Sequence, residues 1–214
     1  MLFRSGRLVE AARHYAEAAR REPDDIATRI SLGTKLCDTG DFAGGLREFS
    51  KALQQQPDLP QAQQALSTMF LAHGFMAEGW AHYRQRPAFV AFRDKLAGVT
   101  LTQTLPDPLE GLHICVLREQ GLGDELFFLR YARWLAQRGA RVTYRCSDAI
   151  ASLVKRLPEV SAVIDNATTL PACNAAILVG DLPHALGNLG GQPAEPDRSD
   201  PPWEIGRASC RERV

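Results

Sequence analysis

The residues best suited to chemistry lie in one short turn, 119–124, with the sequence EQGLGD. The turn follows a short β-rich apolar run and precedes an amphipathic helix. Its glycines let the backbone approach a ligand, and a helix start offers free N–H groups. Open α/β sheets bind ligands beyond the carboxyl ends of their strands. We therefore expect substrate contacts from Glu119, Gln120, Gly121 and Gly123.

Each polar side chain near this turn also has a structural interpretation. Glu119 and Gln120 either contact substrate or only shape the loop. Asp124, placed directly before the expected helix, is of the type that caps free N–H groups. His184, in a Leu-Pro-His segment after the last expected strand, either meets a ligand or is a satisfied residue at a helix start.

The turn does not complete a dinucleotide-binding fingerprint. That motif needs a third glycine, and Leu126 stands at its position. The second expected strand ends in Arg145 and Cys146, where the motif requires an acidic residue. A nicotinamide cofactor is therefore not expected.

The elements that must position the turn alternate in the order of an α/β domain. A linker over 94–111, containing Pro106 and Asp107-Pro108, precedes them. Strands are expected at 114–118, 141–146, 162–164 and 175–179, with a helix at 124–138 and a short helix, capped by Ser147 or Asp148, that reaches residue 156. The pattern predicts one half of a doubly wound parallel sheet.

The first part of the chain is different, because it repeats itself. Gly6, Gly40 and Gly74 recur at a spacing of 34 residues, as do Tyr15, Phe49 and Tyr83. Small residues at 11, 45 and 79 would let helices approach closely, and Pro23 and Pro57 end helices. The pattern resembles the tetratricopeptide repeat, with Leu32-Gly33, Gly40 and Pro57 at motif positions.

The expected fold class is therefore α followed by α/β: a tetratricopeptide helical hairpin array over 1–93, then a Rossmann-like parallel-sheet half-domain over 112–203. We expect five or six helices in the array and an inter-helix turn at each of the three glycines. The first repeat is incomplete. The third is atypical, with Arg86 in place of a small residue and Ala91 in place of proline.

Tetratricopeptide arrays bind proteins or peptides in a groove lined by the first helix of each pair. The polar residues expected there either contact such a partner or form a solvated face. They are Arg29, Lys35, Asp38, Gln61, Gln64 and Thr68.

The segment EQGLGDELFFLRYA, with GW-x-x-YR-x-R at 79–86, resembles the glycosyltransferase-like domain that follows tetratricopeptide repeats in many bacterial proteins. Its Gly-Asp pair also resembles the first loop of heptosyltransferase-type (GT-B) glycosyltransferases. The resemblance covers about 60–203 and is clearest at 118–131. It implies an acceptor site on this domain, a nucleotide-sugar site on a second domain, and Asp124 as catalytic base; the capping interpretation of Asp124 stays open.

Residues 204–214 (EIGRASCRERV) correspond codon for codon to a common short-read sequencing adapter, and we interpret them as an artefact. On that interpretation the domain is truncated, the nucleotide-sugar domain of the parent protein is missing, and this fragment is inactive and carries no cofactor. The competing hypothesis is a non-catalytic protein–protein interaction scaffold.

Composition excludes several other classes. Lys plus Arg and Asp plus Glu are 25 each, so no net charge attracts nucleic acid. No apolar run is long enough to span a membrane, and the N-terminus lacks a signal-peptide pattern. Five cysteines show no metal-ligand spacing, which favours reduced thiols in a cytoplasmic protein. No metal site is expected.

Overall fold

The computed structural model describes residues 2–95 and 99–187. The chain forms two compact units, Met1–Asp94 and Lys95–Val214, and each is described by itself. The adapter interpretation of residues 204–214 lies outside the described residues.

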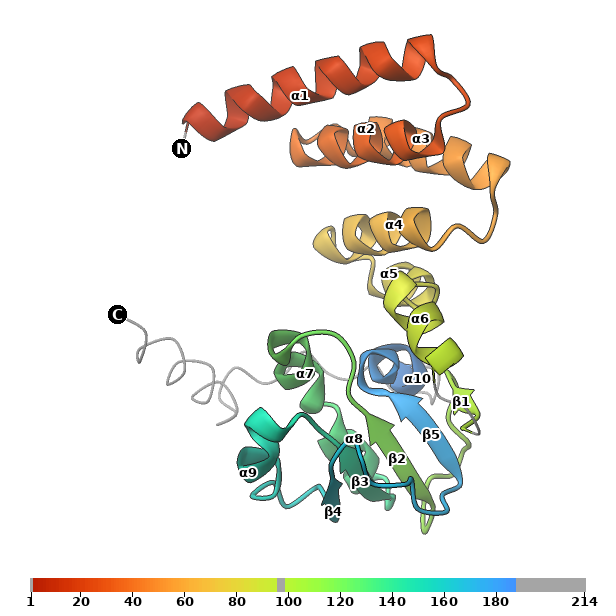
Figure 1. Cartoon of the computed structure of the whole chain (residues 1–214), viewed down its shortest axis with the longest axis vertical. Helices are drawn as coiled ribbons and strands as arrows, with labels where there is room; N and C mark the ends of the chain where they lie inside the picture. Colours follow the sequence, from red (N-terminus) through yellow and green to blue (C-terminus); the bar gives the residue numbers. More distant parts are fainter. Residues whose placement is uncertain (1, 96–98, 188–214) are drawn as a thin grey trace. The chain divides into compact units, whose positions relative to one another are not determined.

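Six helices make up residues 2–95, as expected for the array (Figure 1). They are α1 (Leu2–Arg21), α2 (Ile26–Asp38), α3 (Phe42–Gln55), α4 (Pro60–Ala72), α5 (Met76–Tyr83) and α6 (Pro87–Lys95). Phe49, Leu66 and Met69 form a buried cluster between neighbouring helices. Asp25 and Asp41 cap α2 and α3, since their carboxylates accept hydrogen bonds from Ala27 N and Gly44 N.

The glycine turns of the repeat are confirmed at two of three positions. Gly40 and Gly74 follow α2 and α4 with φ of 92° and 81°, a region that favours glycine. Gly6 lies within α1, so the expected turn there is wrong. Glycine adopts helical backbone angles as well as positive φ, so a glycine at this repeat position does not by itself force a turn.

Small residues do bring helices together at the expected places. A Cβ on Gly45 of α3 would lie 2.8 Å from the carbonyl oxygen of Gly33 on α2. A Cβ on Gly79 of α5 would lie 2.6 Å from Leu71 Cδ2 on α4. The two helices of each pair therefore approach to a separation that a larger side chain would prevent.

The second unit is built on a five-stranded, fully parallel sheet in the order β1-β5-β2-β3-β4 (Figure 1). Its strands are β1 (Leu101–Thr102), β2 (His113–Leu117), β3 (Arg141–Arg145), β4 (Ala162–Ile164) and β5 (Ala175–Leu178). The last four agree with the expected strands to within one residue at each end. The linker expected at 94–111 needs correction, because residues 101–102 pair with β5 as an edge strand.

The helices of this unit are short. They are α7 (Leu122–Leu129), α8 (Ala132–Gln137), η1 (Asp148–Ile150), α9 (Ala151–Val154), η2 (Val179–Asp181) and α10 (Leu182–Gly187).

The single helix expected at 124–138 is two helices, α7 and α8. Arg130 Nε donates to the Phe127 carbonyl at 2.6 Å, the acceptor that Tyr131 N–H would use in a continuous helix. Tyr131 N–H bonds Phe128 O at 3.0 Å instead. The Arg130 guanidinium also lies 3.5 Å from the centre of the Phe127 ring, which holds it at the break.

Candidate functional site

The 119–124 turn lies at the point where the strand order of the sheet reverses. It leaves β2, which has β3 on one side and β5 on the other (Figure 1). In the order β4-β3-β2-β5, the chain proceeds from β2 outward to β4 and then returns to the other side of β2. Such a switch point, at the carboxyl ends of parallel strands, is where open α/β sheets bind ligands.

Glu119 is the first residue of this turn, and the structure buries it. Its side chain is 2% exposed, and its Oε1 accepts a hydrogen bond from the backbone N–H of Gly180 at 3.0 Å. Gly180 belongs to η2, directly after β5. Of the two interpretations of Glu119, this geometry favours the one in which it shapes the loop.

Gln120 lies at the surface in a left-handed conformation, with φ of 57°. A non-glycine residue in that region is uncommon, and such outliers gather at functional loops. On one side of Gln120 the buried carboxylate of Glu119 is bonded to Gly180, and on the other side α7 begins at Leu122. Gln120 therefore presents its side chain from a constrained loop.

Asp124 is exposed and is the third residue of α7. The helix begins at Leu122 and its N-cap is Gly121, with no side-chain capping bond, so the capping interpretation of Asp124 is wrong. A carboxylate in the first turn still interacts favourably with the helix dipole. Gly121 and Gly123 are also exposed, and no atom outside the local helix lies within 4 Å of a Cβ built on Gly123.

Sequence reasoning missed a second buried carboxylate, that of Glu125. It is 1% exposed, and its Oε1 accepts from the backbone N–H of Ser147 at 3.0 Å, just after β3. Nearby, Tyr144 is fully buried and its hydroxyl has no hydrogen-bond partner among the described residues. Burial, and then the charge of Glu125, raise the pKa of the Tyr144 phenol well above its usual range. In the sequence, the position of Glu125 beside the apolar residues of the expected helix was the signal for its burial.

The loop after β5 completes this region. Asp181 is 1% exposed and its Oδ1 accepts from Gln103 Nε2 at 3.3 Å. The helix α7 packs against η2, which contains Asp181. His184 is half-buried in α10, the helix that follows η2. The structure thus joins Glu119 directly to the segment before His184, while Gln120 and Asp124 face solvent.

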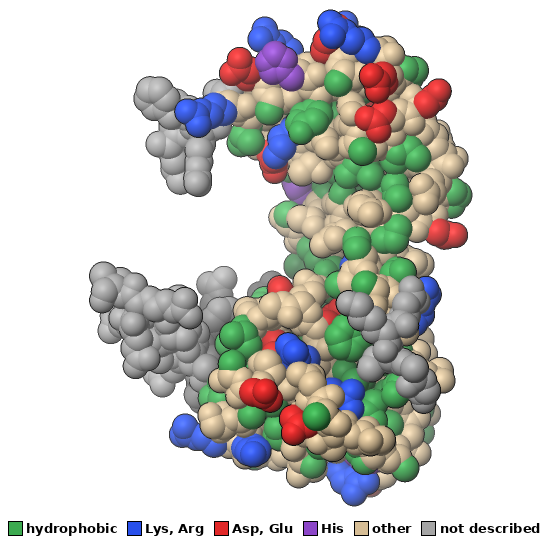
Figure 2. All heavy atoms as spheres, viewed as in Figure 1, with side chains coloured by type: hydrophobic (Ala, Val, Ile, Leu, Met, Phe, Trp, Pro, Cys, Tyr) green, Lys and Arg blue, Asp and Glu red, His purple; other side chains and the backbone are tan. Residues whose placement is uncertain are grey.

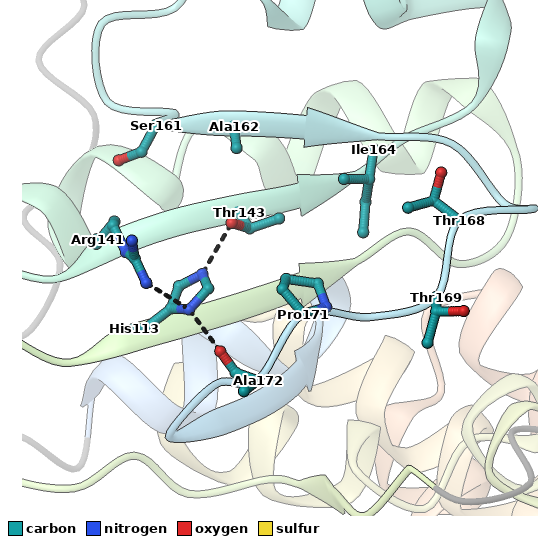
Figure 3. Close-up of a pocket in the computed structure, with 10 residues that line it drawn as sticks. All are labelled: His113, Arg141, Thr143, Ser161, Ala162, Ile164, Thr168, Thr169, Pro171 and Ala172. Atoms are coloured by element: carbon teal, nitrogen blue, oxygen red, sulfur yellow. Dashed lines mark hydrogen bonds between the residues drawn. The ribbon is translucent and has the colours of Figure 1, made fainter.

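A separate hollow of about 380 Å³ lies over one face of the sheet, and we call it the sheet-face hollow (Figure 3). His113 is one of its lining residues, lies next to Arg141 and is 8% exposed (Figure 3). The Nε2 atom of His113 is 2.8 Å from Thr143 Oγ1, and its Nδ1 is 2.9 Å from Ala172 O and 3.0 Å from Arg141 Nη2. The remaining lining residues are Ser161, Ala162, Ile164, Thr168, Thr169 and Pro171.

In the first unit, several expected groove residues are already paired within the chain. Arg29 forms an ion pair with Glu48 at 2.9 Å, and both side chains are largely buried. Lys35 pairs with Asp38 at 2.7 Å. Figure 2 shows charged side chains of both signs interspersed on the visible face of this unit. For Arg29 the pairing favours a structural role over partner contact.

In residues 2–95 and 99–187, no group of three or more His, Cys, Asp or Glu residues is arranged to hold a metal ion. Four cysteines in the same ranges are free thiols: Cys37, Cys115, Cys146 and Cys173. No helix of this part of the chain is long and apolar enough to cross a membrane.

Comparison with known proteins identifies the first unit. Residues 2–69 match the family model described as Tetratricopeptide repeat, so this part of the first unit consists of tetratricopeptide repeats. Protein FlbA of Caulobacter vibrioides is 28% identical over 159 residues, covering 56% of this chain and 26% of that protein. A mutant O-GlcNAc transferase from Thermobaculum terrenum aligns with a TM-score of 0.36 and 15% identity, over 76% of this chain and 38% of that one. The chain thus spans about a quarter of the relative and less than half of the solved structure.

Proposed function

We propose that this chain is part of a bacterial tetratricopeptide-repeat glycosyltransferase-like protein. Its repeats bind a protein or peptide partner, and its α/β unit forms the acceptor side of a sugar-transfer site. The observation that carries the proposal is the Gly-Asp loop at the switch point of the parallel sheet, which presents Asp124 to solvent in the first turn of α7. The proposal includes a cytoplasmic location.

Asp124 is the residue to which we assign the chemistry. Its carboxylate accepts the proton of an acceptor hydroxyl while that oxygen attacks the anomeric carbon of a nucleotide-sugar. The new bond joins the acceptor oxygen to the sugar, and the broken bond releases the nucleotide diphosphate with its electron pair. The acceptor is a sugar or a protein hydroxyl, and the donor binds to a further domain, as the family resemblance implies.

The rest of the loop is assigned to holding the acceptor beside Asp124. Exposed Gln120, Gly121 and Gly123 form the acceptor contact surface, and the first turn of α7, which no side chain caps, supplies backbone N–H donors. Glu119 stays beneath as a fixed connection to the loop after β5. His184 is assigned to the edge of the same surface because its helix follows η2, which packs on α7.

The test has two parts. The intact parent protein, incubated with labelled nucleotide-sugars, should transfer sugar to an acceptor. Calorimetric titration of this chain with uridine and guanosine diphosphates should show weak or no binding. Micromolar binding to this chain would move the nucleotide site into the first α/β unit and contradict the division of roles proposed here.

The second candidate is a non-catalytic interaction scaffold, and one observation favours it. Leu122 and Phe127 of α7 are 46% and 49% exposed, so solvent reaches two large apolar side chains that a partner would cover. On this alternative the intact protein binds its partner and transfers no sugar. A Leu122→Ser, Phe127→Ser double variant that loses partner binding, in a parent without transferase activity, would favour the scaffold.

A further inference from the structure

We propose that the sheet-face hollow binds a small organic anion, a carboxylate or phosphate ester with a short apolar group, through Arg141, which lies beside His113. The hollow crosses the face of the sheet that carries His113 and Thr143 (Figure 3). It is separate from the loop at the carboxyl ends of the strands, and the proposal does not rest on sugar transfer.

The polar groups around His113 have one hydrogen-bond acceptor too few. Its Nδ1 faces both the Ala172 carbonyl, at 2.9 Å, and the Arg141 guanidinium, at 3.0 Å. A carbonyl only accepts and a guanidinium only donates, so one ring nitrogen cannot bond both. If Nδ1 carries a proton, it donates to the Ala172 carbonyl and Arg141 loses its acceptor. If Nδ1 is unprotonated, it accepts from Arg141 and its lone pair faces the Ala172 carbonyl oxygen.

Arg141 has N–H donors available for an added acceptor. The residue is exposed at the start of β3, and no carboxylate among residues 2–95 and 99–187 forms an ion pair with it. A guanidinium has five N–H donors in a planar fork that matches a carboxylate or phosphate. The contact with His113 occupies one nitrogen and leaves the rest of that fork for an anion.

An anion on Arg141 satisfies the whole cluster. Arg141 then donates to the anion, Nδ1–H of His113 donates to Ala172 O, and Nε2 accepts from the Thr143 hydroxyl at 2.8 Å. The walls beside this cluster define the rest of the ligand. Ala162, Ile164 and Pro171 are apolar and accept a short hydrocarbon part, and Ser161, Thr168 and Thr169 also line the hollow (Figure 3).

The experiment is nuclear magnetic resonance on the full chain, following the ring nitrogens of His113 and the amides of Ser161 and Thr168. Butyrate and propyl phosphate are the two anionic probes, and butyramide is the neutral control of the same size as butyrate. We expect both anions to give saturable shifts and to leave Nδ1 as the protonated nitrogen. A response to only one anion narrows the ligand to carboxylates or to phosphate esters.

Two variants distinguish a specific anion site from a general effect of positive charge on anion binding. Arg141→Gln should weaken binding by about tenfold or more, as expected for loss of a charge-assisted hydrogen bond. Arg156→Gln removes the same charge from an exposed position that does not line the hollow and should bind as the parent does. Amide spectra that coincide away from the hollow show that each variant is folded. Absence of shifts up to about 10 mM anion, or equal shifts from butyramide or in Arg141→Gln, would overturn the proposal.

Discussion

The carboxylate of Glu119 bonds the backbone N–H of Gly180 at 3.0 Å, although the two residues lie 61 positions apart in the chain. Glu119 follows β2 and Gly180 follows β5, so the bond joins the two strand ends on either side of the switch point. The side chain is 2% exposed, and water is not in a position to replace it. The loop that carries Gln120 is therefore fixed by a residue that does not itself reach the surface.

Removal of this bond should destabilise the second unit. We expect Glu119→Ala to lower the free energy of unfolding by about 1–3 kcal/mol, because it leaves a buried N–H without an acceptor. Glu119→Gln keeps a carbonyl acceptor and should recover part of that loss. Urea unfolding measures both, with exposed Glu110→Ala as control. If Glu119→Ala and Glu110→Ala have the same small effect, the bond contributes nothing measurable.

The buried hydroxyl of Tyr144 gives a prediction of the opposite sign. Because this hydroxyl has no hydrogen-bond partner among the described residues, its desolvation is uncompensated. Tyr144→Phe should leave the free energy of unfolding unchanged or raise it by up to about 1–3 kcal/mol. Thermal and urea unfolding decide the sign. A loss above about 1 kcal/mol would show that the hydroxyl is bonded in solution.

Two helical glycines should respond oppositely to alanine. Gly45→Ala places a Cβ 2.8 Å from Gly33 O, and we expect a loss of about 1–3 kcal/mol from overpacking. Gly123→Ala meets no atom within 4 Å and should gain up to about 1 kcal/mol from helix propensity. The pair is compared by urea unfolding, each variant against the parent. Equal effects at the two sites would contradict the close approach of α2 and α3.

Asp124 is tested in the intact parent protein. Asp124→Asn should reduce turnover by roughly 10²–10⁴-fold if the carboxylate is the general base. Its cost in stability should be small, about 0.3–1 kcal/mol, because the residue is not the N-cap and loses only its interaction with the helix dipole. Steady-state transfer rates and unfolding curves separate the two effects. Parental turnover in Asp124→Asn would place the base elsewhere.

Local sequence patterns were enough to locate most of the helices and strands. The alternation of apolar runs, turn residues and helical periodicity located β2, β3, β4 and β5 to within one residue. Gly40 and Gly74 mark their turns because a positive φ is a property of the single residue. The break at Arg130 was not predictable in this way, because no proline or glycine marks it. At the break, the Arg130 side chain donates to the Phe127 carbonyl.

The sequence predicted only part of the candidate site. The turn 119–124 and its place after a strand follow from residue types and spacing. The burial of Glu119 and Glu125 does not, since their partners, Gly180 and Ser147, are distant in the chain. A buried carboxylate is tolerated only where such partners exist, and sequence patterns rank it as a surface residue.

The sequence by itself determined the order of the elements, the helical repeat and the loop at the end of β2, because these depend on contacts between near neighbours. Only the tertiary structure decided which strand ends lie side by side. Parallel register sets His113 opposite Arg141, and pairing with β5 turns residues 101–102 into a strand. Both results depend on hydrogen bonds between distant segments, and such bonds leave no periodic pattern in either segment.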